Sequence, residues 1–184
     1  MQSERDKLFE KLLSDSLRRV IDFVRYAEAK HLALLTFSST WVVILIKIIT
    51  EQSWSLAMLG SGTALLLFLI SAGVALVSFV PRTNRTKFYS SGSKGIDAEI
   101  EKNLLFYGDL QQLAPGAAGS ELEKHYTATG EHILSKKFVS DIGEQIVINS
   151  RIAAYKFRLF TIGLVFGFAG IAAILFFAIG LVMQ

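Results

Sequence analysis

The sequence contains no cysteine, only two prolines and only three histidines. Without cysteine the chain can form neither a disulfide framework nor a cysteine-ligated metal centre. The histidines show no triad spacing, and no glycine-rich loop of the Walker or dinucleotide type is present. We therefore expect a protein that is not an enzyme and carries no cofactor or catalytic residue.

Charge is missing from three long stretches. Residues 31–50, 56–80 and 159–183 contain one charged side chain, Lys47, whereas the other 114 residues hold 34 of the 35 charges. About 20 apolar residues cross a ~30 Å hydrocarbon layer, so each stretch predicts a membrane-spanning helix. This pattern excludes a single soluble globular domain. The first apolar run begins behind 30 charge-rich residues with no small-residue cleavage pattern, so we expect no signal peptide.

The basic residues are distributed unevenly around these spans. Residues 1–30 carry seven Lys or Arg, residues 82–158 carry eleven, and residues 51–55 carry none. Because Lys and Arg resist translocation, we expect the N-terminus and residues 81–158 to be cytoplasmic and the C-terminus to lie outside.

The formal charge of +3 is only weakly basic. It fits contact with the anionic headgroups of the lipid bilayer and argues against a nucleic-acid partner, which would favour a strongly basic stripe. The basic residues expected near the headgroups are Arg82, Arg85, Lys87, Arg151, Lys156 and Arg158.

The N-terminal segment 1–30 has apolar residues at helical spacing, and no Gly or Pro separates it from the first span. We expect one amphipathic helix over about residues 7–50. Its apolar stripe packs either on the chain's own cytoplasmic helices or in a seam between protomers. The stripe comprises Phe9, Leu13, Leu17, Val20, Val24 and Ala27.

The second span, 56–80, completes a transmembrane hairpin over residues 31–80 and should end at Pro81, which lacks an amide hydrogen. Residues 83–95 are rich in Asn, Ser and Gly and predict a loop. Asp97 is a suitable N-cap for a helix over residues 98–112.

The rest of the cytoplasmic region 81–158 predicts a loop at 114–120, a short helix at 121–127 and a long helix over about 132–183 with a soft point at Gly143. That helix would continue into the third span, 159–184. The expected fold is therefore an all-α integral membrane protein with three transmembrane helices, two of them extended into a helical cytoplasmic layer, and an oligomer.

One segment of the middle region combines aromatic, polar and glycine residues. Asn103, Tyr107 and Asp109 flank Gly108, which weakens a helix by about 1 kcal/mol relative to Ala. This is either a tight helix crossing with Asp109 paired to a basic neighbour, or a ligand-binding or switch site in which Tyr107 stacks on a base.

The second long helix could contribute Asn149 and Arg151 to the same site. A phosphate would favour Arg151 or Arg85. Asn149, polar on an otherwise apolar stripe, could instead fix helix register as buried amides do in coiled coils.

Glu121, His125 and His132 are candidate metal ligands, but they are too few for a metal site and Gly130 interrupts the segment that carries them. We therefore expect no metal site. Lys47 lies near the outer end of its span, where its side chain either reaches the headgroups or forms a basic ring at a pore mouth.

Small residues follow a GxxxG spacing at Gly163 and Gly167, with Gly170 near the next turn, and Ser71 and Ala75 share that interval. Such residues let helix backbones approach closely in lipid. We expect them to mediate helix packing, either within one protomer or between copies.

Several strings resemble the transmembrane effectors of bacterial Pycsar (pyrimidine cyclase) antiphage systems, and the resemblance runs nearly end to end. They are YAEAKHLALLTF at 26–37, SFVPR at 78–82, NLLFYGDL at 103–110 and DIGEQIVINSRIAAYKFRLF at 141–160. The resemblance implies a multi-pass protein of the bacterial inner membrane that responds to a cyclic pyrimidine mononucleotide such as cUMP or cCMP, made by a cognate cyclase. The resemblance further implies that such a protein then impairs the membrane and arrests the infected cell.

The middle region has a helical pattern, so the signal would be sensed by a helical pocket or by a partner protein, unless this member answers to another signal. A non-catalytic membrane anchor or scaffold that recruits a cytoplasmic partner is the alternative function. A transporter is the third and least favoured function, because three spans with one charge offer no substrate site at the membrane midplane unless oligomers build one.

Overall fold

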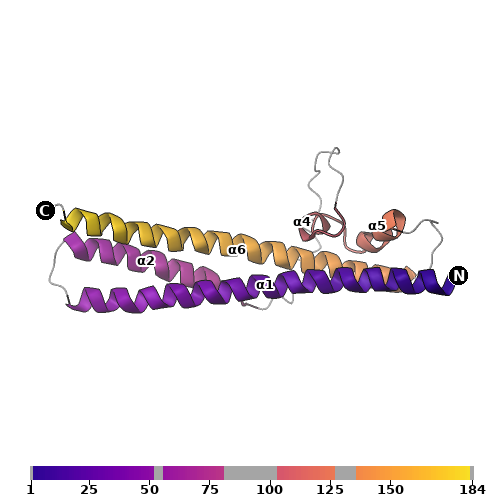
Figure 1. Ribbon diagram of the computed structural model, residues 1–184, viewed down its shortest axis with the longest axis horizontal. Coiled ribbons are helices and arrows are strands. Elements are labelled where there is room, and N and C mark those ends of the chain that lie inside the picture. The colour runs from indigo at the N-terminus through magenta and orange to yellow at the C-terminus, as the bar shows by residue number, and fades with distance from the viewer. Residues whose placement is uncertain (1, 52–55, 81–102, 127–135, 183–184) are drawn as a thin grey trace. The chain divides into compact units, whose positions relative to one another are not determined.

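A computed structural model describes residues 2–51, 56–80, 103–126 and 136–182. All regular structure within these ranges is α-helical, as predicted (Figure 1). Three of the helices are long and apolar enough to cross a membrane. The helices are α1 (Gln2–Glu51), α2 (Leu56–Val77), α4 (Tyr107–Leu110), α5 (Ala117–Tyr126) and α6 (Lys136–Val182).

The two longest helices are unbroken. The helix predicted over residues 7–50 begins five residues earlier, at Gln2, and ends at Glu51, since neither Gly nor Pro occurs in that stretch. Of the helix predicted over 132–183, residues 136–182 are helical and the first four lie outside the described residues. Neither helix has a joint near Lys30 or Arg158.

Internal contacts divide the chain into two units. The polar unit comprises Met1–Tyr26 and Arg82–Tyr155, and the membrane unit comprises Ala27–Pro81 and Lys156–Gln184. Both α1 and α6 contribute residues to each unit.

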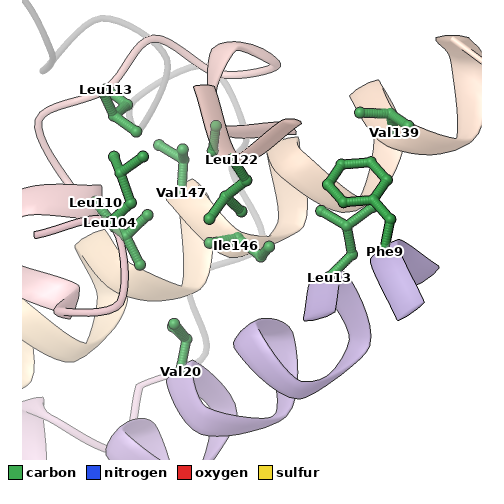
Figure 2. Packing of buried hydrophobic residues seen from close by; sticks show 11 residues of the cluster. Phe9, Leu13, Val20, Leu104, Leu110, Leu113, Leu122, Val139, Ile146 and Val147 are labelled. Atoms are coloured by element: carbon green, nitrogen blue, oxygen red, sulfur yellow. The ribbon is translucent and has the colours of Figure 1, made fainter. Parts of the chain in front are cut away.

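The polar unit has its own hydrophobic core (Figure 2). Phe9, Leu13, Leu17 and Val20 of the predicted stripe of α1 pack in this core, so this part of the stripe contacts the chain's own helices, one of the two arrangements expected. The buried residues come from α1, α4, α5, α6 and the segments between them: Phe9, Leu13, Val20, Leu104, Leu110, Leu113, Ala118, Leu122, Val139, Ile146 and Val147.

Two glycines allow α5 and α6 to touch. A Cβ on Gly119 would lie 2.4 Å from the carbonyl oxygen of Val139, and one on Gly143 would lie 2.6 Å from the amide nitrogen of Gly119. The loop predicted over 114–120 is therefore too long, because α5 begins at Ala117 and Gly119 is a helix-contact residue. Gly116, with φ of 86°, makes the turn before it.

The helix predicted over residues 98–112 is wrong for its described part. Only Tyr107–Leu110 is helical, while Asp97 and residues 98–102 lie outside the described residues. The Asn103 side chain accepts a hydrogen bond from the Leu105 amide at 3.0 Å. Side-chain bonds of this kind compete with helix formation, which explains the non-helical chain before Tyr107.

In the membrane unit α2 runs antiparallel to both neighbours, as the contact pairs show. Along α1, Ser38 contacts Ser71 and Trp41 stacks on Phe68, with ring centroids 5.7 Å apart. Along α6, a Cβ on Gly170 would touch Phe68, and Phe177 would touch a Cβ on Gly60. α2 ends at Val77, and turn hydrogen bonds continue to residue 80, which fits the restriction that Pro81 places on the residue before it.

The surface of the membrane unit is apolar and its interior holds hydroxyl groups. Leu59, Leu66 and Val165 are 69%, 59% and 61% exposed. The hydroxyl groups of Ser38 and Ser71 lie 3.0 Å apart in the interior. Apolar residues outside with paired polar groups inside are the arrangement that a hydrocarbon solvent favours. The chain is therefore a membrane protein.

We predict that Gly143→Ala lowers the stability of the polar unit. The added methyl group overlaps the backbone of Gly119 and should cost about 2 kcal/mol, or roughly 4 to 8 °C in Tm, in thermal unfolding of the detergent-solubilised protein. Gly73→Ala is the matched control, because nothing lies within 4 Å of its Cβ position. Equal Tm changes in both variants would contradict close packing at Gly143.

Candidate functional site

The segment from Asn103 to Leu110 forms a closed turn in the polar unit. The Asn103 amide donates a hydrogen bond to the Asp109 carboxylate at 3.0 Å, which joins the two ends of the turn. Together with the bond from the Leu105 amide to the Asn103 side chain, it fixes the backbone around α4. Asp109 therefore has a structural role in this turn.

Aromatic rings gather on the same turn. The Tyr107 ring lies 4.9 Å from that of Phe23 on α1 and 4.8 Å from that of Phe106. Phe106 remains 45% exposed. A Cβ on Gly108 would lie 2.4 Å from the Phe106 ring, so glycine is needed for this ring to fold back. The turn thus combines an aromatic surface with a carboxylate, a pairing that can stack on a base and accept its hydrogen bonds.

Arg151 on α6 holds the chain that follows α4. Its Nε donates to the Gln111 carbonyl at 2.8 Å, and its Nη2 donates to the Leu113 carbonyl at 2.7 Å. The residue is 6% exposed, and this burial lowers the pKa of the guanidinium. Arg151 thereby fastens residues 111–113 to α6.

The five residues predicted for a ligand or switch site do not all lie at one place in the structure. Asn103, Tyr107 and Asp109 lie together in the α4 turn. Arg151 reaches the backbone just beyond it. Asn149 donates its amide hydrogen to the Gln145 carbonyl within α6 at 2.8 Å.

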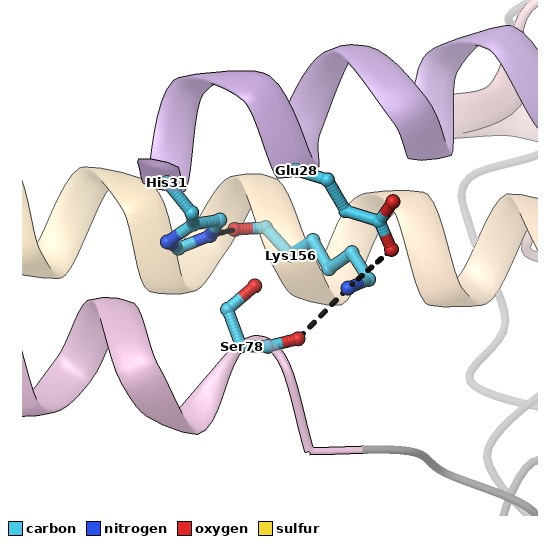
Figure 3. A network of polar contacts seen from close by, with 4 residues as sticks. All are labelled: Glu28, His31, Ser78 and Lys156. Carbon is cyan, nitrogen blue, oxygen red and sulfur yellow. Dashed lines mark hydrogen bonds and ion pairs between the residues drawn. The ribbon is translucent and has the colours of Figure 1, made fainter. Parts of the chain in front are cut away.

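A second polar cluster, in the membrane unit, involves residues that the sequence did not single out for this role (Figure 3). The Lys156 ammonium donates to the Ser78 carbonyl at 2.8 Å and pairs with the Glu28 carboxylate at 3.1 Å. His31 Nε2 lies 2.9 Å from the Lys156 carbonyl oxygen. This cluster links α1, the turn after α2, and α6.

The expectation that Arg151 and Lys156 meet lipid headgroups is therefore wrong. Lys156 is 8% exposed, and both side chains are bound by protein groups, whereas Arg158 is exposed. The spacing in the sequence could have indicated that Lys156 is buried. Residue 156 follows Ser150 and Ala153 at three-residue steps, and all three lie on the buried face of α6. His31 likewise continues the stripe of α1 after Ala27.

The glycines of the predicted packing motif differ in their contacts. A Cβ on Gly163 would lie 2.8 Å from Leu34, and one on Gly170 would lie 2.8 Å from Phe68. Gly167 has room, since its nearest neighbour would be the Ser71 hydroxyl at 3.6 Å. The Ser71 hydroxyl also donates to the Gly163 carbonyl at 2.8 Å.

Glu121 and His125 face each other on α5 with 3.5 Å between Oε2 and Nε2. His132 lies outside the described residues. Among the residues described, no group of three or more His, Cys, Asp or Glu side chains is placed to hold a metal ion.

The helices, with apolar side chains on the surface of the membrane unit and hydroxyl groups in its interior, define an all-α membrane protein with three candidate spans. Residues 12–184 match the family model of the Pycsar effector protein domain. The chain is 33% identical over 176 residues to the Pycsar effector protein RsPycTM of a Rhizobium species, covering 93% of this chain and 90% of that protein. The chain belongs to the Pycsar effector family. No solved structure matches it.

We predict that Arg151→Lys loosens the segment after α4. One ammonium cannot reproduce the fork that binds two carbonyls, so amide hydrogens of residues 109–113 should exchange about tenfold faster. Hydrogen exchange with mass spectrometry measures this. Arg158→Lys, an exposed change on the same helix, should leave the exchange unchanged. Unaltered exchange in Arg151→Lys would contradict the clamp.

We predict that Lys156→Met destabilises the membrane unit by about 2 kcal/mol, because the Ser78 carbonyl and the Glu28 carboxylate lose their charged partner. The expected fall in Tm is roughly 4 to 8 °C in detergent. Lys137→Met is the control, because that lysine is exposed on α6. A Lys156→Met protein as stable as the control would show that the cluster contributes nothing.

Proposed function

We propose that this chain is a non-enzymatic antiphage effector of the bacterial inner membrane. On sensing a cyclic pyrimidine mononucleotide such as cUMP or cCMP, it rearranges and impairs the membrane, and so arrests the infected cell. The N-terminus and residues 81–158 are cytoplasmic and the C-terminus lies outside. Family membership and the excess of Lys and Arg in these two segments support this assignment.

The observation that carries the proposal is the continuity of α1 and α6. Each helix begins among polar residues and ends among apolar ones with no break between. A ligand can shift an equilibrium only by binding its states unequally, and an unbroken helix transmits that bias without a hinge. Ligand binding in the polar unit would thereby alter helix packing in the bilayer.

The α4 turn is the proposed sensing site. Phe106 and Tyr107 would stack on the pyrimidine, and the Asp109 carboxylate would accept a hydrogen bond from it. Arg151 supports the turn from α6, so a ligand that moves the turn would act directly on a helix that enters the membrane unit.

Impairing the bilayer requires more than one copy. Side chains such as Leu45 and Phe68 pack together in the interior between α1, α2 and α6, and three helices packed in this way are too few to enclose a pore. We expect homo-oligomers in which ligand binding changes contacts between copies.

The test is ligand-dependent dye release from liposomes that contain the purified protein. We predict release with cUMP or cCMP and none with cAMP. Tyr107→Leu should weaken nucleotide binding, measured by calorimetry, about tenfold, because stacking on an aromatic ring contributes about 1–3 kcal/mol. Asp109→Asn keeps one oxygen that can accept from the Asn103 amide, but it removes the charge and replaces the other oxygen with an NH2 donor.

Tyr126→Leu is the matched control, since that tyrosine is 48% exposed on α5 outside the turn. Binding that is lost equally in this control would remove the α4 turn from the proposal. Release that ignores both nucleotide and variants would remove ligand gating. A harmless protein whose role survives replacement of its spans would be the anchor or scaffold instead.

A further inference from the structure

The membrane unit has a groove of about 310 Å³ between α1 and α6. Lys30 lies at one end of the α1 side, which continues through Ala33 to Phe37. Phe160, Gly167 and Phe168 belong to the α6 side. Apart from the Lys30 ammonium, these side chains are apolar.

The groove is not a by-product of tight packing inside the chain. Glycine is required at positions 163 and 170, because Leu34 and Phe68 occupy the space that a Cβ would need. A Cβ on Gly167 would meet nothing closer than 3.6 Å. It would make an ordinary van der Waals contact with the Ser71 hydroxyl, so internal packing does not require glycine at this buried position, which also lines the groove. Phe37 and Phe168, 41% and 62% exposed, flank it on the outer surface.

The polarity of the groove changes along its length. The Lys30 ammonium lies 5.3 Å from the centroid of the Phe160 ring and 5.6 Å from that of Phe157. Lys30 is also the last basic residue of α1 before the apolar span. One end of the groove is thus cationic and lies at the polar boundary, while the remainder extends into the apolar zone.

The length of the groove identifies its occupant. From Phe160 to Ile171, its last residue on α6, the helix rises about 16 Å. Half of a ~30 Å hydrocarbon layer is about 15 Å, the depth of one leaflet. A helix from a second copy would extend along the full span, whereas an acyl chain occupies one leaflet.

We propose that this groove is a binding site for an anionic phospholipid. One acyl chain lies along Gly167 between α1 and α6, and the phosphate pairs with the Lys30 ammonium at the membrane boundary. The site is independent of the nucleotide site proposed above. It makes the lipid composition of the membrane a determinant of how α1 and α6 pack.

The test is native mass spectrometry of the full chain in detergent with added phosphatidylglycerol or phosphatidylcholine. We expect one phosphatidylglycerol retained per chain, in preference to phosphatidylcholine. Lys30→Gln should reduce that preference about fivefold, which corresponds to about 1 kcal/mol for one basic side chain at the headgroup. Gly167→Leu should fill the groove and reduce retention of both lipids.

Two matched variants change the same residue types elsewhere. Lys47→Gln removes an exposed lysine at the far end of α1, and Gly73→Leu adds a side chain at an open position of α2. Both should retain lipid as the wild type does. Lipid retention unchanged in Lys30→Gln and Gly167→Leu would overturn the site. So would a loss of oligomer mass in Gly167→Leu with lipid retention intact, since the groove would then be an interface between copies.

Discussion

A hydrocarbon layer supplies no hydrogen-bond partners, and this constraint governs the whole fold. Every backbone amide and carbonyl within the bilayer must be paired inside the chain, which a helix achieves without help from its neighbours. The same periodic bonding continues past the apolar segments, because α1 contains neither Gly nor Pro and α6 contains no Pro. The solvent changes along these helices, but their backbone geometry does not.

Several polar side chains in the membrane unit follow the same constraint. Ser38 and Ser71 share a hydrogen bond, the Ser71 hydroxyl also reaches the Gly163 carbonyl, and Lys156 is held by a carbonyl and a carboxylate. The hydrophobic effect does not drive one helix against another in lipid, so packing and interhelical hydrogen bonds must do so. Together with the close packing at Gly163 and Gly170, these polar contacts specify which faces of α1, α2 and α6 meet.

Periodicity and length were enough to predict the long helices and the stripe of α1, because both properties are local in sequence. The α4 turn was mistaken for a helix, since Asn103 and Asp109 satisfy backbone groups across six residues that no periodic pattern reports. Lys156 was assigned to the headgroups because composition cannot show that a carbonyl of the α2 turn and Glu28 would approach it. The placement of Asn103, Tyr107 and Asp109 in one turn followed from their adjacency, whereas the two carbonyls that bind Arg151 could be found only in three dimensions.

Attachment of the Lys156 ammonium to residues on either side of it has a mechanical consequence. A side chain anchored on α6 that binds both Glu28 and the Ser78 carbonyl resists independent rotation of any one of the three elements. Twisting α6 about its axis would have to drag the other two or rupture the contact. A rotation of α6 at Lys156 should therefore be coupled to the neighbouring parts of α1 and the α2 turn.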